Sequence, residues 1–286
     1  MSTSITITGA SGFIGKALVS ELKKLKIYKL YLVSKTQKDS NYFYTNSFAS
    51  LPKTDVIFHL GQNSDRHEIN SNNSLVEEAL NDLEYIISNN YKQIIFCSSA
   101  SVYGDKGNKP FKENDAVYEY DNYSFMKIES EKKVLEANGC VLRLANVIGL
   151  NMSKNTVLMD IISQLGLKKK LIVNDIKSIR DFVPLDHVLK VMLEIMKVNH
   201  QGIYNVGTGR EISVKNLIKI VLDIAGETSR NYSSKEKNLK YSYNVLNIKK
   251  LKKIMEIQHK TSIEDTLYDI IKNEKKSNSS FYGKQV

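Results

Sequence analysis

The sequence predicts an α/β protein: a doubly wound parallel β-sheet, followed by a smaller domain of mixed helices and strands. The 286 residues are 42% hydrophobic and 25% charged, which is ordinary for a globular protein. Short apolar runs alternate with longer amphipathic stretches, as expected for βαβ units whose parallel strands are buried. A glycine-rich turn also lies between the first predicted strand and the first predicted helix.

The elements of the sheet follow one another through the first half of the chain. The β-branched run 3–8 predicts a strand, and apolar residues recur at helical spacing within 16–26. Further apolar runs predict strands near 31–35 and at 55–61, 93–99 and 141–149. Amphipathic stretches predict helices at 74–90 and 123–138.

The pattern changes after residue 149. We expect a helix at 156–166, a strand at 171–174, a helix at 187–198 and a strand at 203–209, then helices at 214–226 and 263–273. The segment 150–180 reads as an insertion rather than as another βαβ repeat. The polar residues 273–286 are expected to form a flexible tail.

Composition argues against several classes of protein. The net charge is +10, but only five of the 41 basic residues are arginines, which usually recognise bases and phosphates, so we expect no nucleic-acid partner. No apolar run approaches the ~20 residues of a membrane span, so we expect no membrane partner. Cys97 and Cys140 lie in apolar runs without the spacing of disulfides or metal ligands, which predicts no metal and a cytoplasmic location.

The glycine turn predicts a dinucleotide site. Gly9, Gly12 and Gly15 have GxxGxxG spacing, a variant of the usual GxGxxG. In such a turn the first glycine allows the sharp bend, the second admits the pyrophosphate, and the third lets helix and strand pack closely. The alternative is a glycine-rich helix start that binds nothing. The residues predicted to bind the dinucleotide here are Gly9, Ser11, Gly12, Phe13, Ile14 and Gly15.

The end of the second strand bears on the choice of cofactor. NAD sites usually carry Asp or Glu there for the ribose hydroxyls, but this chain has Val33, Ser34, Lys35 and Thr36. Ser34 and Lys35 are suited to a 2′-phosphate, which favours NADP(H) over NAD(H). The alternative is that Lys35 is one more solvated lysine.

Seven segments occur in the order seen in one known family. The segments are TGASGFIG (8–15), HLG (59–61), SSASVYG (98–104), YSFMK (123–127), LRLANVIG (142–149), RDFVPLDHV (180–188) and YNVGTG (204–209). Through them the chain resembles the extended short-chain dehydrogenases/reductases, in the nucleotide-sugar epimerase/dehydratase group, over nearly its whole length. That resemblance implies a Rossmann fold, with Leu60 and Gly61 near the cofactor and His59 in a structural role.

The same resemblance implies that Ser99, Tyr123 and Lys127 are catalytic, and that Tyr123 and Lys127 also contact the cofactor. A phenol with a pKa of about 10 is a poor base at neutral pH, so it needs a nearby cation. Lys127 lies one helical turn after Tyr123, on the same face. Ser99 would hold the substrate oxygen while Tyr123 exchanges a proton with a sugar hydroxyl.

Substrate contacts are implied for Ser99, Ser101, Asn146 and Arg180. For Arg180 the alternative is a structural ion pair with Asp181 or Asp186. An arginine that the family carries before its last strand is not evident here. Lys235 or Lys237 would have to replace it near the diphosphate.

Departures from the family narrow the reaction. Sugar 4,6-dehydratases carry an Asp-Glu pair after the catalytic hydroxyl residue, and epimerase-reductases carry a cysteine just after the serine, whereas this chain has Ala100 and Ser101. Redox at C4 of a nucleoside-diphosphate sugar remains, by a 4-epimerase or a 4-ketoreductase. The alternative is a non-catalytic NADP(H)-binding sensor or scaffold, a class that typically lacks the tyrosine or the lysine.

The resemblance also suggests how the chain is organised. Residues 1–149, with about 181–209, are expected to bind NAD(P), and about 150–180 with 210–272 to bind the substrate. A homodimer would form through the predicted helices at 74–90 and 123–138.

Overall fold

The main sheet has seven parallel strands, in the order β3-β2-β1-β4-β5-β6-β11. The structure is a computed structural model, and it describes residues 3–36, 43–45, 47–167, 169–235, 241–256 and 261–282. The doubly wound parallel sheet predicted from the sequence is confirmed. Its strands are β1 (Ser4–Thr8), β2 (Lys29–Ser34), β3 (Phe43–Tyr44), β4 (Val56–His59), β5 (Gln93–Ser99), β6 (Cys140–Leu144) and β11 (Gly202–Val206).

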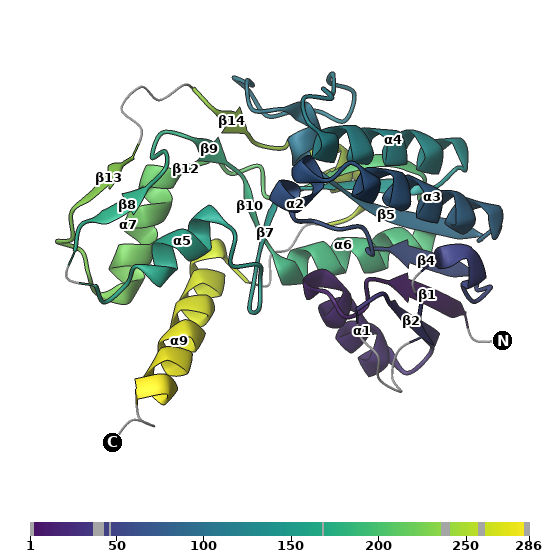
Figure 1. Ribbon diagram of the computed structural model, residues 1–286, viewed down its shortest axis with the longest axis horizontal. Coiled ribbons are helices and arrows are strands. Elements are labelled where there is room, and N and C mark those ends of the chain that lie inside the picture. Colours follow the sequence, from purple (N-terminus) through teal and green to yellow (C-terminus); the bar gives the residue numbers. More distant parts are fainter. Residues whose placement is uncertain are drawn as a thin grey trace.

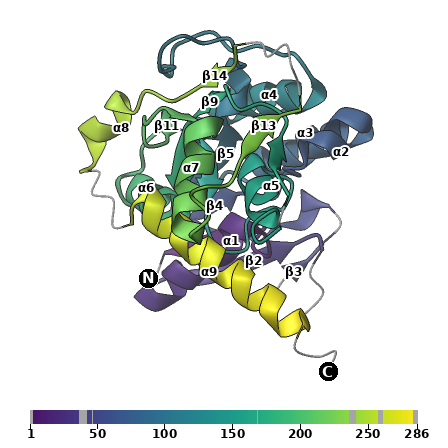
Figure 2. The same cartoon turned by 90° about the vertical axis from the view of Figure 1, so that its left-hand side faces the viewer.

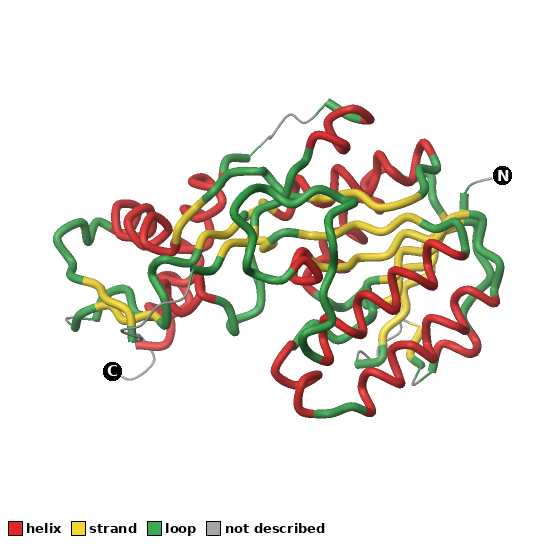
Figure 3. The backbone as a smooth tube through the Cα atoms, turned by 90° about the horizontal axis from the view of Figure 1, so that it is seen from above, coloured by secondary structure: helices red, strands yellow, loops and turns green. Residues whose placement is uncertain are grey.

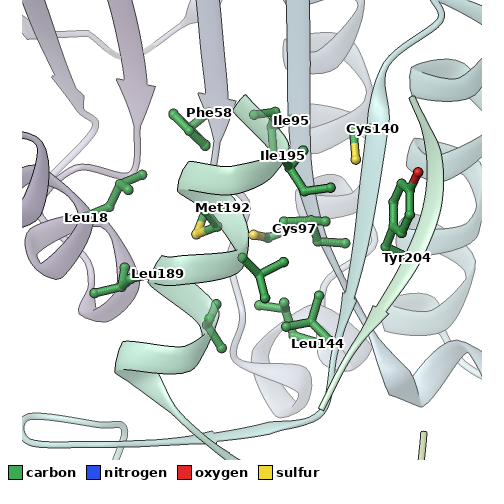
Figure 4. Packing of buried hydrophobic residues seen from close by; sticks show 14 of the residues in the cluster. Leu18, Phe58, Ile95, Cys97, Cys140, Leu144, Leu189, Met192, Ile195 and Tyr204 are labelled. Atoms are coloured by element: carbon green, nitrogen blue, oxygen red, sulfur yellow. The ribbon is translucent and has the colours of Figure 1, made fainter. Parts of the chain in front are cut away.

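Helices cover both faces of this sheet (Figure 1). One face carries α1 (Phe13–Leu25) and α6 (Leu185–Val198), and the other carries α3 (Ser74–Ser88) and α4 (Asn122–Glu136), with the short α2 (Arg66–Ser71) beside α4. Because side chains alternate along a strand, Ile95 and Cys97 of β5 join the core under α6, while Ile94 and Phe96 join the core under α3 and α4. Figure 4 shows Leu189, Met192 and Ile195 of α6 packed toward Phe58, Ile95 and Cys97.

A smaller region with its own hydrophobic core lies beyond one end of the sheet (Figures 1 and 2). Its core is built from α5 (Val157–Ser163), α7 (Val214–Ala225) and α9 (Ile263–Tyr282), together with β8 (Leu171–Val173), which pairs with β13 (Tyr232–Ser234). The remaining strands are β7 (Asn146–Ile148), β9 (Ile179–Arg180), β10 (Phe182–Pro184), β12 (Ile212–Ser213) and β14 (Tyr243–Asn244), and the remaining helices are α8 (Lys249–Ile254) and two short 3-10 helices, η1 (Phe48–Ser50) and η2 (Ala100–Tyr103).

Two expectations about the elements need revision. The single strand expected at 141–149 is two strands: the amide of Ala145 still bonds to Val206 of β11 at 2.9 Å, but that of Asn146 bonds to Asp181 at 3.0 Å, and β7 then pairs with β10. The chain thus leaves the main sheet at this point for the smaller region. Helix α9 continues to Tyr282, through much of the expected tail, and residues 283–286 lie outside the described residues.

The strand order reverses between β1 and β4, which neighbour each other although β2 and β3 come between them in sequence. In doubly wound sheets, ligands bind in the crevice outside the carboxyl ends of the strands at such a reversal. The strands run side by side between the helical layers (Figure 3). The turn after β1 and the loop after β4 therefore meet where a binding site is expected.

Candidate active site

The glycine turn after β1 depends on the absence of side chains at two positions. Gly9 has a φ of +65°, and a Cβ there would lie 2.5 Å from the carbonyl oxygen of Leu60. A Cβ on Gly15 would lie 2.1 Å from the carbonyl oxygen of Gly9. The turn, the loop after β4 and the start of α1 are therefore packed together through bare backbone.

A cleft of about 740 Å³ opens above this turn, within the usual size of a cofactor pocket. Helix α1 begins there after Gly12, with no acidic residue in its first turn and no side-chain cap. Its free amides can therefore receive an anion. The predicted cofactor residues that line the cleft are Gly9, Ser11, Gly12, Phe13, Ile14, Gly15, Lys35, Leu60, Gly61, Tyr123 and Lys127.

Ser34 is not among the residues that line the cleft. It is buried, and its hydroxyl lies 2.8 Å from that of Ser11. It thus holds the glycine turn against the end of β2 and contributes to the site through Ser11.

Lys35 lies at one end of the cleft with partners that the sequence did not suggest. Its ammonium forms ion pairs with Glu78, at 2.6 Å, and with Asp82, both on α3, and lies 4.8 Å from the ring centroid of Phe48. Burial alone would lower the pKa of Lys35, but the hydrogen bonds and charges of Asp82 and Glu78 outweigh it, so the pKa is raised. Carboxylates therefore do stand near the end of β2, supplied by α3.

At the other end of the cleft the predicted catalytic residues come together. Tyr123 is buried, and it lines the cleft together with Ser99, which lies at the end of β5. Burial raises the pKa of the Tyr123 phenol, while the Ser99 hydroxyl and the positive charge of Arg66 oppose that rise. The phenol is therefore protonated at neutral pH.

Lys127 lies below Tyr123, with its Nζ 5.8 Å from the centroid of the tyrosine ring. The ammonium donates to Gln62 Oε1 at 3.0 Å and to the Cys97 carbonyl at 3.1 Å, and both acceptors are neutral. Burial lowers the pKa of Lys127 to about 8. Two hydrogen bonds thus hold this lysine in place, and neither acceptor carries a charge that would cancel its own.

His59 is placed as a core residue. Its Nδ1 lies 2.8 Å from the hydroxyl of Thr8, and its ring stacks on Phe96 and meets Phe48 edge-on. Burial lowers its pKa to about 3, with smaller contributions from the charges of Lys127 and Lys35. The ring is therefore neutral at ordinary pH.

The four predicted substrate residues line one pocket, which adjoins the cleft at Ser99. They are Ser99, Ser101, Asn146 and Arg180. Arg180 donates to the Ser242 carbonyl at 3.2 Å and to its hydroxyl at 2.6 Å. It pairs with neither Asp181 nor Asp186, so the alternative of a structural ion pair with one of them is wrong. Lys235 shares a further pocket with Arg180, whereas Lys237 lies outside the described residues.

Several polar residues of these pockets were not predicted. Gln62 contacts Lys127, and Arg66 stacks over Tyr120 at 5.0 Å while its Nε donates to Asp121 at 2.7 Å. No local pattern marks them, because they occupy a loop and the start of a six-residue helix. The one available signal in the sequence was that these residues follow the HLG segment. The residues with polar or charged side chains that line the cleft or the pocket around Ser99, but were not assigned to the site from the sequence, are Thr36, His59, Gln62, Asn63, Ser64, Arg66, Glu68, Glu78, Asp82, Ser98, Asp105, Tyr120 and Asn244, together with Cys97.

This geometry fits a nicotinamide dinucleotide. The cradle at Gly12, the uncapped start of α1 and the long cleft ending at Tyr123 and Lys127 suit a pyrophosphate with a ring system at either end. The model of the NAD dependent epimerase/dehydratase family matches residues 5–207. The chain belongs to this family.

Known relatives within the family differ in their reactions. Over 253 residues the chain is 26% identical to the dTDP-4-dehydro-6-deoxyglucose reductase of Escherichia coli, covering 76% of this chain and 80% of that one. It superposes with a TM-score of 0.82 and 22% identity on a UDP-glucose 4-epimerase from Thermotoga maritima with UDP-glucose, covering 96% and 99% of the two chains. RMD from Pseudomonas aeruginosa, complexed with NADPH, gives 0.81 at 20% identity, covering 96% and 99%. The match to the family model supports an enzyme that uses a nicotinamide cofactor, and the two solved structures share its fold.

Proposed function

We propose that this protein oxidises or reduces C4 of a nucleoside-diphosphate sugar, as a 4-epimerase or a 4-ketoreductase, with Tyr123 as the acid/base. The observation that carries the proposal is the convergence of Ser99, Tyr123 and Lys127 at the far end of a cleft that begins at the glycine turn. A non-catalytic sensor would not need this arrangement.

Each of the three residues has a role that its environment supports. Ser99 lines the cleft beside Tyr123, so its hydroxyl can hold the sugar oxygen within reach of the phenol for proton transfer. Tyr123 takes the hydroxyl proton during oxidation and returns it during reduction. The charge of Lys127 stabilises the phenolate across a buried, poorly screened distance. A bound nicotinamide cofactor supplies the hydride acceptor or donor.

The cofactor we now propose is NAD(H). Lys35, the residue that favoured NADP(H), already forms ion pairs with Glu78 and Asp82. The cluster of these three side chains carries a net charge of −1 when all of them are ionised. A 2′-phosphate brought to it would meet Glu78 and Asp82 as well as the ammonium. The contacts of Lys35 therefore support a cofactor with an unmodified ribose.

For the substrate, we propose that Arg180 and Lys235 bind the diphosphate, because they line one pocket of the smaller region. We retain the predicted division of the chain into cofactor and substrate regions, with one amendment. Leu246, Ile248 and Leu251 pack into the main core, so this stretch belongs with the cofactor region.

We also propose a homodimer through α3 and α4, which expose Tyr85 and Phe125. Light scattering of wild type and of Tyr85→Glu tests it, and a wild-type monomer would contradict it.

A cytoplasmic location is supported by the two free, buried cysteines. Among the described residues no helix has both the length and the apolar character needed to span a bilayer.

The test of the function is Tyr123→Phe, with Tyr118→Phe at an exposed tyrosine as the matched control. Nucleoside-diphosphate sugars and their 4-keto forms are offered with NAD(H) and NADP(H), and products are identified by NMR. An epimerase inverts C4 without net cofactor change, whereas a ketoreductase consumes reduced cofactor. Tyr123→Phe should lose about 10²- to 10⁴-fold in rate with its cofactor affinity intact. Full activity in Tyr123→Phe would reject the assignment.

A further inference from the structure

The amide of Gln62 bridges the loop after β4 and helix α4 in one fixed orientation. Its Oε1 accepts from Lys127 Nζ at 3.0 Å, and its Nε2 donates to Ser130 Oγ at 2.7 Å. The single hydroxyl proton of Ser130 is donated to the Met126 carbonyl at 2.8 Å, so Ser130 has only acceptor capacity left for Gln62. A flipped amide would point its NH₂ at the Lys127 ammonium, and it would keep a bond to Ser130 only if that hydroxyl gave up the Met126 carbonyl.

The acceptors around Lys127 are unusual for a buried lysine. Its side chain lies among residues of β4, β5 and α4, and it forms no ion pair with any described residue. The nearby carboxylate, Glu131, is engaged by Arg143 at 2.6 Å. The titratable groups that face Lys127 are His59 of β4, Cys97 of β5, and Tyr123 and Glu131 of α4, while Glu68, Glu78 and Asp82 of the surrounding helices bond to Asn63 or Lys35.

We propose that Gln62 is a positioning residue that holds the Lys127 ammonium at the end of the cleft through a neutral acceptor and so leaves its charge available to Tyr123. A carboxylate at the same place would hold the lysine equally well but would cancel its charge. A smaller or apolar residue would leave the charge free but the lysine unfixed. The catalytic part of this inference rests on the proposed function. The control of Lys127 by Gln62 does not.

Two substitutions of Gln62, which should shift the pKa of Lys127 in opposite directions, test the inference in the protein without cofactor or substrate. Gln62→Glu keeps the shape of the side chain, and Ser130 can turn its hydroxyl to donate to the new carboxylate. It should raise the midpoint at which Lys127 loses its proton by about 1 to 3 pH units. Gln62→Leu removes the acceptor and should lower that midpoint, because burial already favours the neutral amine.

The measurement is an NMR titration of lysine labelled with ¹³C at Cε, with the Lys127 signal assigned from Lys127→Arg. Asn63→Asp is the matched control. It adds the same charge in the same loop, at a side chain that bonds to Glu68 rather than to Lys127. Its Lys127 midpoint should stay near that of wild type. If the Gln62→Glu midpoint equals that of Asn63→Asp, the inference is overturned.

Rate measurements then separate this inference from the proposed function. The pH profile of turnover in Gln62→Glu should move in the same direction as the Lys127 midpoint. A midpoint that moves while the rate profile stays fixed would reject the catalytic use of Lys127. It would still support the control of Lys127 by Gln62.

Discussion

The two ends of the cleft each hold a lysine, and their surroundings are opposite. Lys35, toward the end of β2, meets Glu78 and Asp82. Lys127, beside Tyr123, donates its hydrogen bonds to the neutral oxygens of Gln62 and Cys97, and it has no ion pair among the described residues. Burial acts against the charge of both, but the pKa of Lys35 is raised by its carboxylates, whereas that of Lys127 falls to about 8.

The difference shows how one residue type takes two roles in a single cleft. A lysine whose charge is cancelled by carboxylates fixes α3 against β2 and offers little to a phosphate. A lysine held by neutral groups carries a charge that no carboxylate cancels, in a poorly hydrated place where it acts strongly on a neighbouring phenol. The role of each lysine is therefore determined by the groups that accept its hydrogen bonds.

The largest expected effect comes from removing the charge at the Tyr123 end. Lys127→Met keeps most of the apolar stem, so the fold should persist, but the phenolate loses its stabilising cation. Turnover should fall by about 10²- to 10⁴-fold, measured as initial rates with saturating cofactor. Lys35→Met is the matched control and should retain most of the activity. Comparable losses in both variants would erase the distinction between the two ends.

A substitution in the glycine turn, between the Lys35 and Tyr123 ends of the cleft, should weaken binding of the whole cofactor. Gly12→Val places a branched side chain where the pyrophosphate is expected, while the backbone there is ordinary and its Cβ would approach only the Gly9 carbonyl oxygen, at 3.2 Å. The protein should fold and bind NAD(H) about tenfold or more weakly by calorimetry, a loss of about 1.4 kcal/mol or more. Unchanged affinity would place the cofactor elsewhere.

The Lys35 end can be made to resemble the other by removing its carboxylates. In the double variant Glu78→Gln with Asp82→Asn, the ammonium becomes available, and affinity for NADPH should rise about tenfold relative to NADH, as expected for a charge-assisted hydrogen bond to phosphate. In Lys35→Ala both affinities should change little. A selective loss of NADPH binding in Lys35→Ala would reinstate NADP(H) as the cofactor. Each titration is run at fixed ionic strength.

The last expected effect concerns how the free energy of unfolding depends on pH. For Lys127 the folded pKa of about 8 lies below the ordinary 10.5, so between these values the unfolded chain binds a proton that the folded protein does not. Stability therefore rises with pH in this window, by up to about 1.4 kcal/mol per pH unit, and Lys127→Met should lack the rise. For Lys35, with its raised pKa, the contribution is present below 10.5 and declines as pH rises further. Urea unfolding of the variants across pH 7 to 11 compares the two, and equal pH slopes for wild type and Lys127→Met would contradict the expectation.

Local patterns in the sequence determined the frame of this protein. Alternating strand residues and helical spacing place Ser99 at the end of β5 and Tyr123 and Lys127 one turn apart on α4, and GxxGxxG spacing places Gly9 and Gly15 where side chains cannot fit. Contacts between distant segments were decided only by the tertiary structure. Lys35 meets Asp82 across 47 residues, and Gln62 meets Lys127 across 65. Periodicity indicates which face of its own helix or strand a residue occupies. The residue that it contacts on another element depends on how the elements pack, and that contact determines the pKa of each lysine.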